Sequence, residues 1–323
     1  MGYAIVAPAP GGPEVLKRVP FTPPAPGAGE VLVRHTAIGV NFIDVYFRSG
    51  LYPWPVERDL ILGSEAAGVV EAVGPEVAGF APGQRVAYTL PNFAYATHRV
   101  VPAAHLVHLP ESVSDLQAAA AMLKGLTACY LLHDSYAVQE GQTVLFHAAA
   151  GGVGLIAGQW LKAKGVRAIG TAGGPEKVAL ARAHGYAEVI DYRSEDFVAR
   201  VKELTGGEGV HAAYDSVGRD TILGSAEVLR SFGTLVSFGQ SSGPPDQFRI
   251  SHLARASLRL TRPMLFHYTA RRDWLEQAAA ALFEMIGSGA IRLDITEMPL
   301  AEAAAAHAAL EGRRTTGSLV LRP

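Results

Sequence analysis

The stretch Thr143-Val-Leu-Phe-His-Ala-Ala-Ala-Gly-Gly-Val-Gly-Leu-Ile-Ala157 decides the fold of this chain. An apolar run, typical of a buried strand, leads into a glycine-rich turn and then into the apolar start of a helix. Dinucleotide-binding turns follow the pattern G-x-G-x-x-G, whose special positions fall here on Ala149, Gly151 and Gly154. In order, these positions allow a tight turn, close approach of the backbone to a pyrophosphate, and close packing of the helix on the strand. The stretch therefore predicts a dinucleotide site, with phosphate held at the helix start.

The segments around this stretch alternate between strand and helix patterns, which predicts a parallel sheet with helices on its faces. The expected strands cover residues 143–148, 166–171, 188–190, 210–215, 234–238 and 258–261. The expected helices cover residues 152–164, 175–184, 194–204 and 220–230. Upstream, the capping-box sequence Ser114-Asp-Leu-Gln117 predicts a helix over 118–123, with a second helical segment over 125–136.

The first 110 residues have a different pattern. Short apolar or alternating runs are separated by Pro and Gly clusters, which suggests a small barrel or sandwich with one helix over 41–48. The runs cover residues 3–7, 30–38, 66–73, 84–88 and 95–101. Beyond residue 262 we expect helices over 273–286 and 300–310 and a strand over 318–321, too few elements for a third domain. The predicted domains are therefore 1–123, completed by 263–323, and 124–262.

Composition narrows the class of protein. Hydrophobic residues make up 49% of the 323 residues and charged residues 18%, a balance typical of a folded globular protein. The net charge of −2 gives no electrostatic reason to expect nucleic acid or an anionic membrane as partner. Residues 1–6 lack the basic and apolar segments of a signal peptide, and the single cysteine, Cys129, cannot form an intrachain disulfide. We expect a soluble cytoplasmic protein.

The residues after the second expected strand indicate which nicotinamide cofactor is bound. NAD sites usually carry an acid at this point, but the strand ends Gly170-Thr-Ala-Gly-Gly174. Lys177 follows on the next helix, and Tyr192 and Arg193 follow the third strand. With N–H groups of Gly173 and Gly174 they could hold a 2′-phosphate, so NADP(H) is favoured, although Lys177 and Arg193 could be ordinary surface charges.

Two further strand ends are candidates, because ligands of doubly wound sheets bind beyond the carboxyl ends of the strands. They are Ser216-Val-Gly218 and Phe238-Gly-Gln-Ser-Ser242, and both could instead be plain turns.

A metal site is not expected. One cysteine excludes a thiolate-rich zinc site, and none of the 11 His stands in an H-x-x-H or H-E-x-x-H arrangement on an expected helix.

Several motifs together resemble those of the zinc-free quinone oxidoreductase (zeta-crystallin-like) branch of the medium-chain dehydrogenase/reductase superfamily. They are Asn41-Phe-Ile-Asp44 with Tyr46, Ser49-Gly-Leu-Tyr-Pro53, Gly63-Ser-Glu-Ala-Ala-Gly-Val69, Lys124-Gly-Leu-Thr127, His147-Ala-Ala-Ala-Gly-Gly-Val-Gly154 and Tyr214-Asp-Ser-Val-Gly218. The match covers essentially the whole chain. Zinc-dependent members carry G-H-E where this chain has Gly63-Ser64-Glu65, and a cysteine where Asn41 stands. These differences agree with the expectation that the chain has no metal site.

The resemblance implies an α/β protein: a GroES-like β-rich domain, completed by the C-terminal segment, and a Rossmann domain with a doubly wound parallel sheet. It also implies an active site in the cleft between the domains, a homodimer or tetramer, and NADPH as donor. The implied catalytic residues are Asn41, Tyr46, Tyr52 and Thr127. The implied cofactor-binding residues are Asn41, Tyr46, Thr127, Tyr130, Gly151, Gly152, Val153, Gly154, Gly173, Gly174, Lys177, Tyr192, Ser216, Val217, Phe238, Gly239, Ser241 and Arg313.

The expected reaction transfers a hydride from NADPH to a quinone, and water supplies the proton, so positioning dominates catalysis. Tyr46 and Tyr52 could donate hydrogen bonds to a developing phenolate and Asn41 could orient an acceptor oxygen. The alternative is that these side chains only pack, with Tyr52 in a surface loop that covers the barrel. One alternative is reduction of activated C=C bonds in 2-alkenals or enones, where a proton must reach carbon. Another is a structural or RNA-binding role, which the lack of an RNA-recognition motif disfavours. The sequence leaves open the physiological acceptor and whether one or two electrons are transferred.

Overall fold

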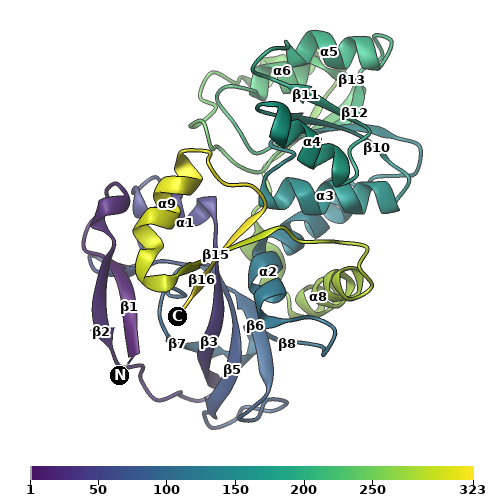
Figure 1. Ribbon diagram of the computed structural model, residues 1–323. Helices are drawn as coiled ribbons and strands as arrows, with labels where there is room; N and C mark the ends of the chain where they lie inside the picture. The colour runs from purple at the N-terminus through teal and green to yellow at the C-terminus, as the bar shows by residue number, and fades with distance from the viewer. Residues whose placement is uncertain (1) are drawn as a thin grey trace. The chain divides into compact units, whose positions relative to one another are not determined.

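A computed structural model describes residues 2–323 and separates the chain into two compact units (Figure 1). Unit 2 comprises Thr127–Leu265, and unit 1 comprises the residues up to Leu126 together with Phe266–Pro323. These limits lie three residues beyond the expected limits after residues 123 and 262. The first limit falls inside helix α2 (Asp115–Tyr130), so one helix belongs to both units.

Unit 2 is a six-stranded parallel sheet with the strand order β11-β10-β9-β12-β13-β14. The chain starts in the middle of the sheet, winds to one edge, returns to the middle and winds to the other edge. This is the doubly wound order, which confirms the Rossmann prediction, and its switch point lies between β9 and β12. The strands are β9 (Thr143–Phe146), β10 (Arg167–Ala172), β11 (Glu188–Asp191), β12 (Val210–Asp215), β13 (Leu229–Ser237) and β14 (Arg259–Thr261).

The helices of unit 2 connect these strands and cover the sheet. Residues Leu145, Ile169 and Leu235 of the sheet and Val201 and Ile222 of two helices are buried in its apolar core. The helices are α3 (Gly152–Ala163), α4 (Pro175–Ala183), α5 (Phe197–Leu204), α6 (Ile222–Glu227) and the 3₁₀ segment η4 (Ile250–Ala256).

Unit 1 is β-rich, as expected, and its C-terminal segment completes its larger sheet. Strand β16 (Ser318–Arg322) pairs with β3 (Glu30–Val40), so residues near both ends of the chain share one sheet (Figure 1). This sheet has the order β15-β16-β3-β5-β6-β8, with β7 (His98–Pro102) also paired to β3. Its other strands are β15 (Ile295–Pro299), β5 (Glu65–Val73), β6 (Arg85–Thr89) and β8 (Leu106–His108). A second sheet contains β2 (Lys17–Phe21), β1 (Gly2–Ala7) and β4 (Leu60–Ile61).

Two helices of unit 1 pack against each other. Helix α1 (Phe42–Arg48) begins directly after β3, and α9 (Ala303–Glu311) packs against it. The remaining helices are α7 (Leu265–Thr269), which begins at the unit limit, and α8 (Arg272–Gly287), and the short 3₁₀ segments are η1 (Pro13–Val15), η2 (Ala103–His105) and η5 (Leu300–Glu302).

Some expectations about elements were wrong. The segments expected at 118–123 and 125–136 form one continuous helix, α2, followed by a π-helical turn, Leu131–Ser135, because Gly125 packs against Leu282 without breaking the helix. Strand β2 was missed because its Pro20 suggested a turn; β2 is an edge strand, where a missing N–H is tolerated. Helix α5 begins at Phe197, not residue 194, because the Asp196 carboxylate accepts two N–H groups of the first turn.

Candidate functional site

The glycine turn after β9 has the geometry of a phosphate-binding loop. Helix α3 begins at Gly152, directly after the turn, and the Gly151 N–H donates to the Ala148 carbonyl at 2.9 Å. The sharp change of direction is made by Ala148, with φ of +53°, one residue before the expected position at Ala149. Ala149 is buried, and its N–H is bonded to Thr171 of the neighbouring strand.

Gly151 and Gly154 differ in the space around them, as their two expected tasks require. A Cβ on Gly154 would lie against the Ala148 carbonyl oxygen and 2.7 Å from that of Ala149, so α3 can pack this closely only with glycine there. A Cβ on Gly151 would meet one atom within 4 Å, the Ala148 oxygen at 3.2 Å, and otherwise open space. This arrangement fits a pyrophosphate, which needs open backbone N–H groups at the start of a helix.

The second group of candidates lies beyond the ends of β10 and β11. A Cβ on Gly173 would lie 2.5 Å from the Tyr192 hydroxyl, and one on Gly174 would lie 3.1 Å from the Arg193 guanidinium. These contacts show that Tyr192 and Arg193 lie over the two glycines. Lys177 is in the first turn of α4, whose N-cap residue is Gly174.

An acid near these residues was missed from the sequence. Asp191, the last residue of β11, accepts the N–H groups of Gly174 at 2.9 Å and Arg193 at 3.0 Å on one carboxylate oxygen. These bonds lower the pKa of its carboxyl. The Gly174 N–H is therefore engaged and does not face a phosphate as expected. Asp191 could have been found from the sheet order, because β11 lies beside β10.

The third group of candidates lies beyond β12 and β13. Phe238 donates its N–H to the Asp215 carbonyl at 2.8 Å, and Ser241 donates its N–H to the Ser216 carbonyl at 3.1 Å. A Cβ on Gly239 would lie 2.7 Å from that Ser216 oxygen. The two expected loops therefore pack directly on each other at the carboxyl edge of the sheet.

A buried hydrogen-bond chain fixes these strand ends from below. The Asp215 carboxylate accepts N–H groups of Val217 and Gly218, both at 2.9 Å, and the Ser225 hydroxyl at 2.7 Å. Because the Ser225 hydroxyl donates its only hydrogen to Asp215, its oxygen accepts a hydrogen bond from His147 Nε2 at 2.9 Å. Burial lowers the pKa of His147. The ring is therefore neutral, and its Nδ1 accepts the Thr171 hydroxyl, also at 2.9 Å.

Three candidate site residues of unit 1 lie in helix α1 or directly beside it. Asn41 caps its start, Tyr46 is buried within it, and Tyr52 follows in the next loop. The rings of Tyr46 and Tyr52 lie 5.3 Å apart, and the Tyr52 N–H donates to the Tyr46 carbonyl at 3.0 Å.

The remaining candidates lie in other elements. Arg313 lies in the turn after α9 with a φ of +54°. Thr127 and Tyr130 are buried in the last turns of α2, in unit 2.

A fully buried carboxyl lies in the first turn of α1. Asp44 accepts the Asn41 N–H at 2.9 Å, the Ser64 hydroxyl at 2.6 Å and the Tyr95 hydroxyl at 3.3 Å. Burial raises the pKa of Asp44 from 3.8 to about 7, although the hydrogen bonds from Ser64 and Asn41 oppose this. Beyond Tyr95, the network continues through His307 to Arg48 and the Glu311 carboxylate.

The donor set at this place does not fit zinc. Asn41 and Ser64 provide no thiolate or imidazole, and the neighbouring Glu65 carboxylate is held by Lys124 at 2.7 Å, Asn41 at 2.8 Å and the Leu123 N–H at 2.6 Å. Among residues 2–323, no group of three or more His, Cys, Asp or Glu side chains is arranged to hold a metal ion.

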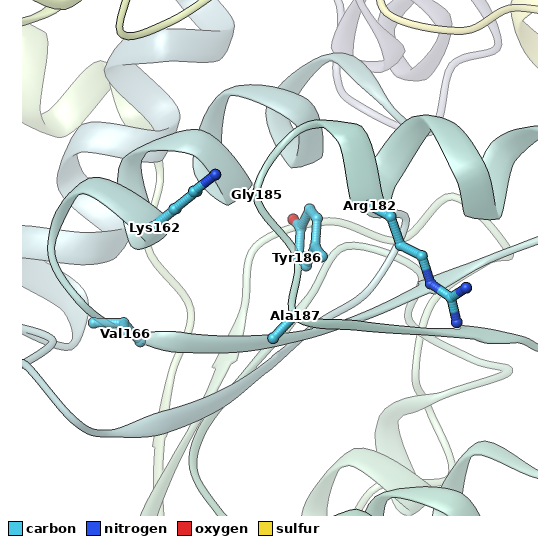
Figure 2. A pocket seen from close by; sticks show the side chains of 6 residues that line it. All are labelled: Lys162, Val166, Arg182, Gly185, Tyr186 and Ala187. Atoms are coloured by element: carbon cyan, nitrogen blue, oxygen red, sulfur yellow. The ribbon is translucent and has the colours of Figure 1, made fainter.

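A surface pocket of unit 2 lies away from the candidate residues (Figure 2). Val166 and Ala187, which precede β10 and β11, line it together with Lys162, Arg182 and Tyr186. It is therefore at the amino edge of the sheet, whereas every candidate of unit 2 beyond a strand is at the carboxyl edge.

Comparison with known proteins identifies the class as a two-domain, nicotinamide-dependent dehydrogenase/reductase. Residues 27–111 match the alcohol dehydrogenase GroES-like domain family and residues 152–284 match the zinc-binding dehydrogenase family. Quinone oxidoreductase of Pseudomonas aeruginosa is 52% identical over 316 residues, covering 97% of each chain. The structure of Escherichia coli quinone oxidoreductase complexed with NADPH has 45% identity and a TM-score of 0.96, covering 99% of this chain and 100% of that one.

A 2-haloacrylate reductase of Burkholderia is also similar, at 43% identity over 308 residues, covering 93% of this chain and 92% of the relative. The chain belongs to the quinone oxidoreductase branch of the medium-chain dehydrogenase/reductase superfamily, which confirms the expected family and fold class. Within residues 2–323, no helix is long and apolar enough to cross a membrane.

The raised pKa of Asp44 predicts a specific pH dependence of stability. The unfolded carboxyl ionises near 3.8 and the folded one near 7, so the folded state retains a proton between these values. The free energy of unfolding contributed by this proton is fully present below pH 3.8 and is lost as pH rises through 7. Between pH 4 and 8 the free energy of unfolding of the wild type should therefore fall by at most about 4 kcal/mol more than that of the Asp44→Asn variant. Urea unfolding of both proteins at each pH measures this difference. If the two free energies of unfolding change in parallel with pH, the prediction is wrong.

Proposed function

We propose that this protein is an NADPH-dependent quinone reductase. The observation that carries the proposal is the turn at the switch point of the sheet, where Gly154 has no room for a side chain and Gly151 is open apart from the Ala148 carbonyl oxygen. Its quinone oxidoreductase relatives, one of them complexed with NADPH, support the same activity. When bound, NADPH supplies a hydride to the quinone, which becomes a hydroquinone after taking up one proton from water.

The residues of unit 2 bind and orient the cofactor. The N–H groups at the start of α3 hold the pyrophosphate, because they have no partners within the helix and lie at its positive end. Lys177 and the Tyr192 hydroxyl hold the 2′-phosphate, together with the backbone at Gly173. Asp191 shapes this loop through its two backbone bonds. Ser216, Val217, Phe238, Gly239 and Ser241 hold the rest of the dinucleotide along the carboxyl edge.

The residues around α1 orient the acceptor. Asn41 caps the start of one short helix, Tyr46 lies within that helix, and the ring of Tyr52 packs on that of Tyr46. Their hydrogen-bond donors suit an oxygen that gains negative charge during reduction. Thr127 and Tyr130 contribute at the nicotinamide end, and Arg313 is a further cofactor contact.

Lys177 tests the choice of NADPH over NADH. Lys177→Ala removes a charge-assisted contact to the 2′-phosphate, so the KM for NADPH should rise about tenfold to a hundredfold. The KM for NADH should change less than about twofold, because NADH lacks this phosphate. Lys162→Ala, at the amino edge of the same sheet, is the matched control and should alter neither constant. Equal effects of Lys177→Ala on both cofactors would remove Lys177 from the phosphate site.

A second candidate function is the reduction of activated C=C bonds, which the 2-haloacrylate reductase relative favours. That reaction needs a proton at the α-carbon and therefore a placed donor, for which Tyr46 or Tyr52 would serve.

A substrate panel separates the two functions. NADPH oxidation should be fast with 1,4-benzoquinone and 9,10-phenanthrenequinone and slow with 2-alkenals and 2-haloacrylates. Absorbance at the NADPH band measures both sets, with an enzyme-free reaction as control for direct reduction of the quinone. Turnover of enals without any turnover of quinones would overturn the leading proposal.

We also propose that the protein is cytoplasmic and forms a homodimer through unit 2. Strand β14 is an edge strand of the parallel sheet, and its Leu260 is 41% exposed. Phe232 of the adjacent strand β13 and Met264 are also exposed. Light scattering should give twice the mass of the chain, and Leu260→Glu should give a monomer; a monomeric wild type would contradict the proposal.

A further inference from the structure

A deeply buried ion pair of unit 1 joins Glu65, the first residue of β5, to Lys124 of α2. The ammonium lies 2.7 Å from one carboxylate oxygen, and the residues are 0% and 5% exposed. Burying two charges costs more desolvation energy than a pair of apolar or neutral side chains would cost. Packing alone therefore does not account for the pair.

The partners of Glu65 link three elements. The carboxylate oxygen that binds Lys124 also accepts the Asn41 side-chain amide at 2.8 Å. The other oxygen accepts the Leu123 N–H at 2.6 Å, although this N–H belongs to the middle of a helix. A Cβ on Gly39 of β3 would lie against the same carboxylate, so the backbone closes its remaining side.

We propose that the Glu65–Lys124 ion pair positions Asn41 by holding the NH₂ end of its amide, so that one N–H binds Glu65 and the second N–H of the same group serves the acceptor. This inference rests on the proposed quinone reductase function and names two positioning residues for it. Neither Glu65 nor Lys124 needs to touch the substrate.

The charge state of Glu65 explains the orientation. An ionised carboxylate only accepts hydrogen bonds, so the NH₂ end of Asn41 must face it and the oxygen end must face away. Lys124 supplies the balancing charge, because a buried carboxyl without a cation takes up a proton. A protonated carboxyl, or a glutamine, can donate as well as accept, and the Asn41 amide could then face it with either end.

Two variants separate positioning from simple structural support. Lys124→Met removes the ammonium at similar length, and the double variant Glu65→Gln/Lys124→Met replaces the ion pair with a neutral, buried pair. The double variant should regain most of the melting temperature lost in Lys124→Met, because a glutamine carries no charge that must be neutralised for burial. It should not regain turnover, because a glutamine no longer fixes the Asn41 amide.

The expected result is a kcat with 1,4-benzoquinone about tenfold or more below wild type in both variants, with the Kd for NADPH changed less than about twofold. Asp115→Asn is the matched control, since Asp115 lies on the same helix in a partly exposed ion pair with Arg85; its kcat should equal that of wild type. If kcat returns together with the melting temperature in the double variant, or if Lys124→Met retains its kcat, the inference is wrong. An inactive wild type would instead reject the proposed function.

Discussion

The carboxyl edge of the parallel sheet depends on the buried carboxylate of Asp215. Where parallel strands end, the backbone loses its neighbours and must find other hydrogen-bond partners. Asp215 accepts N–H groups of Val217 and Gly218 and hydroxyls of Thr221 and Ser225. Through Ser225 and His147 the chain of hydrogen bonds reaches Thr171, and so ties together the ends of β12, β9 and β10. The loops that carry the proposed cofactor contacts start from this fixed edge.

In unit 1, buried carboxyls near the start of α1 also need hydrogen-bond partners. Asp44 and Glu65 are both fully buried carboxyls within one small region, and each is surrounded by donors. Asp44 has hydroxyl and N–H donors only, and burial raises its pKa. Glu65 has a cation beside it. Two carboxyls so close together are therefore held in different ways, one by neutral donors and one by a charge, and Asn41 contacts both.

The surroundings of Gly173 and Gly174 illustrate how a site can keep a carboxylate and still suit a phosphate. Asp191 uses one oxygen for two backbone N–H groups, which satisfies that oxygen locally. Tyr192 and Arg193 follow Asp191 directly, so the bonds that hold the loop also place these side chains over the glycines. Although β10 ends without an acid, the neighbouring strand β11 brings the Asp191 carboxylate to Gly174, and Tyr192 and Arg193 lie over the two glycines.

The sequence by itself determined the order of elements in unit 2, the glycine turn, and the residues that follow each strand. These are local properties: apolar runs, caps and glycines act within a few residues, so a pattern along the chain reveals them. It also predicted that the C-terminal segment would return to unit 1. Only the tertiary structure decided which strand lies beside which, and so brought Asp191 to Gly174 and Lys124 to Glu65. It also decided that Ala148, not Ala149, makes the turn, because the Ala149 N–H is bonded to Thr171 of the next strand. Contacts between residues that are 17 or 59 positions apart depend on sheet order and helix packing, which no local pattern encodes.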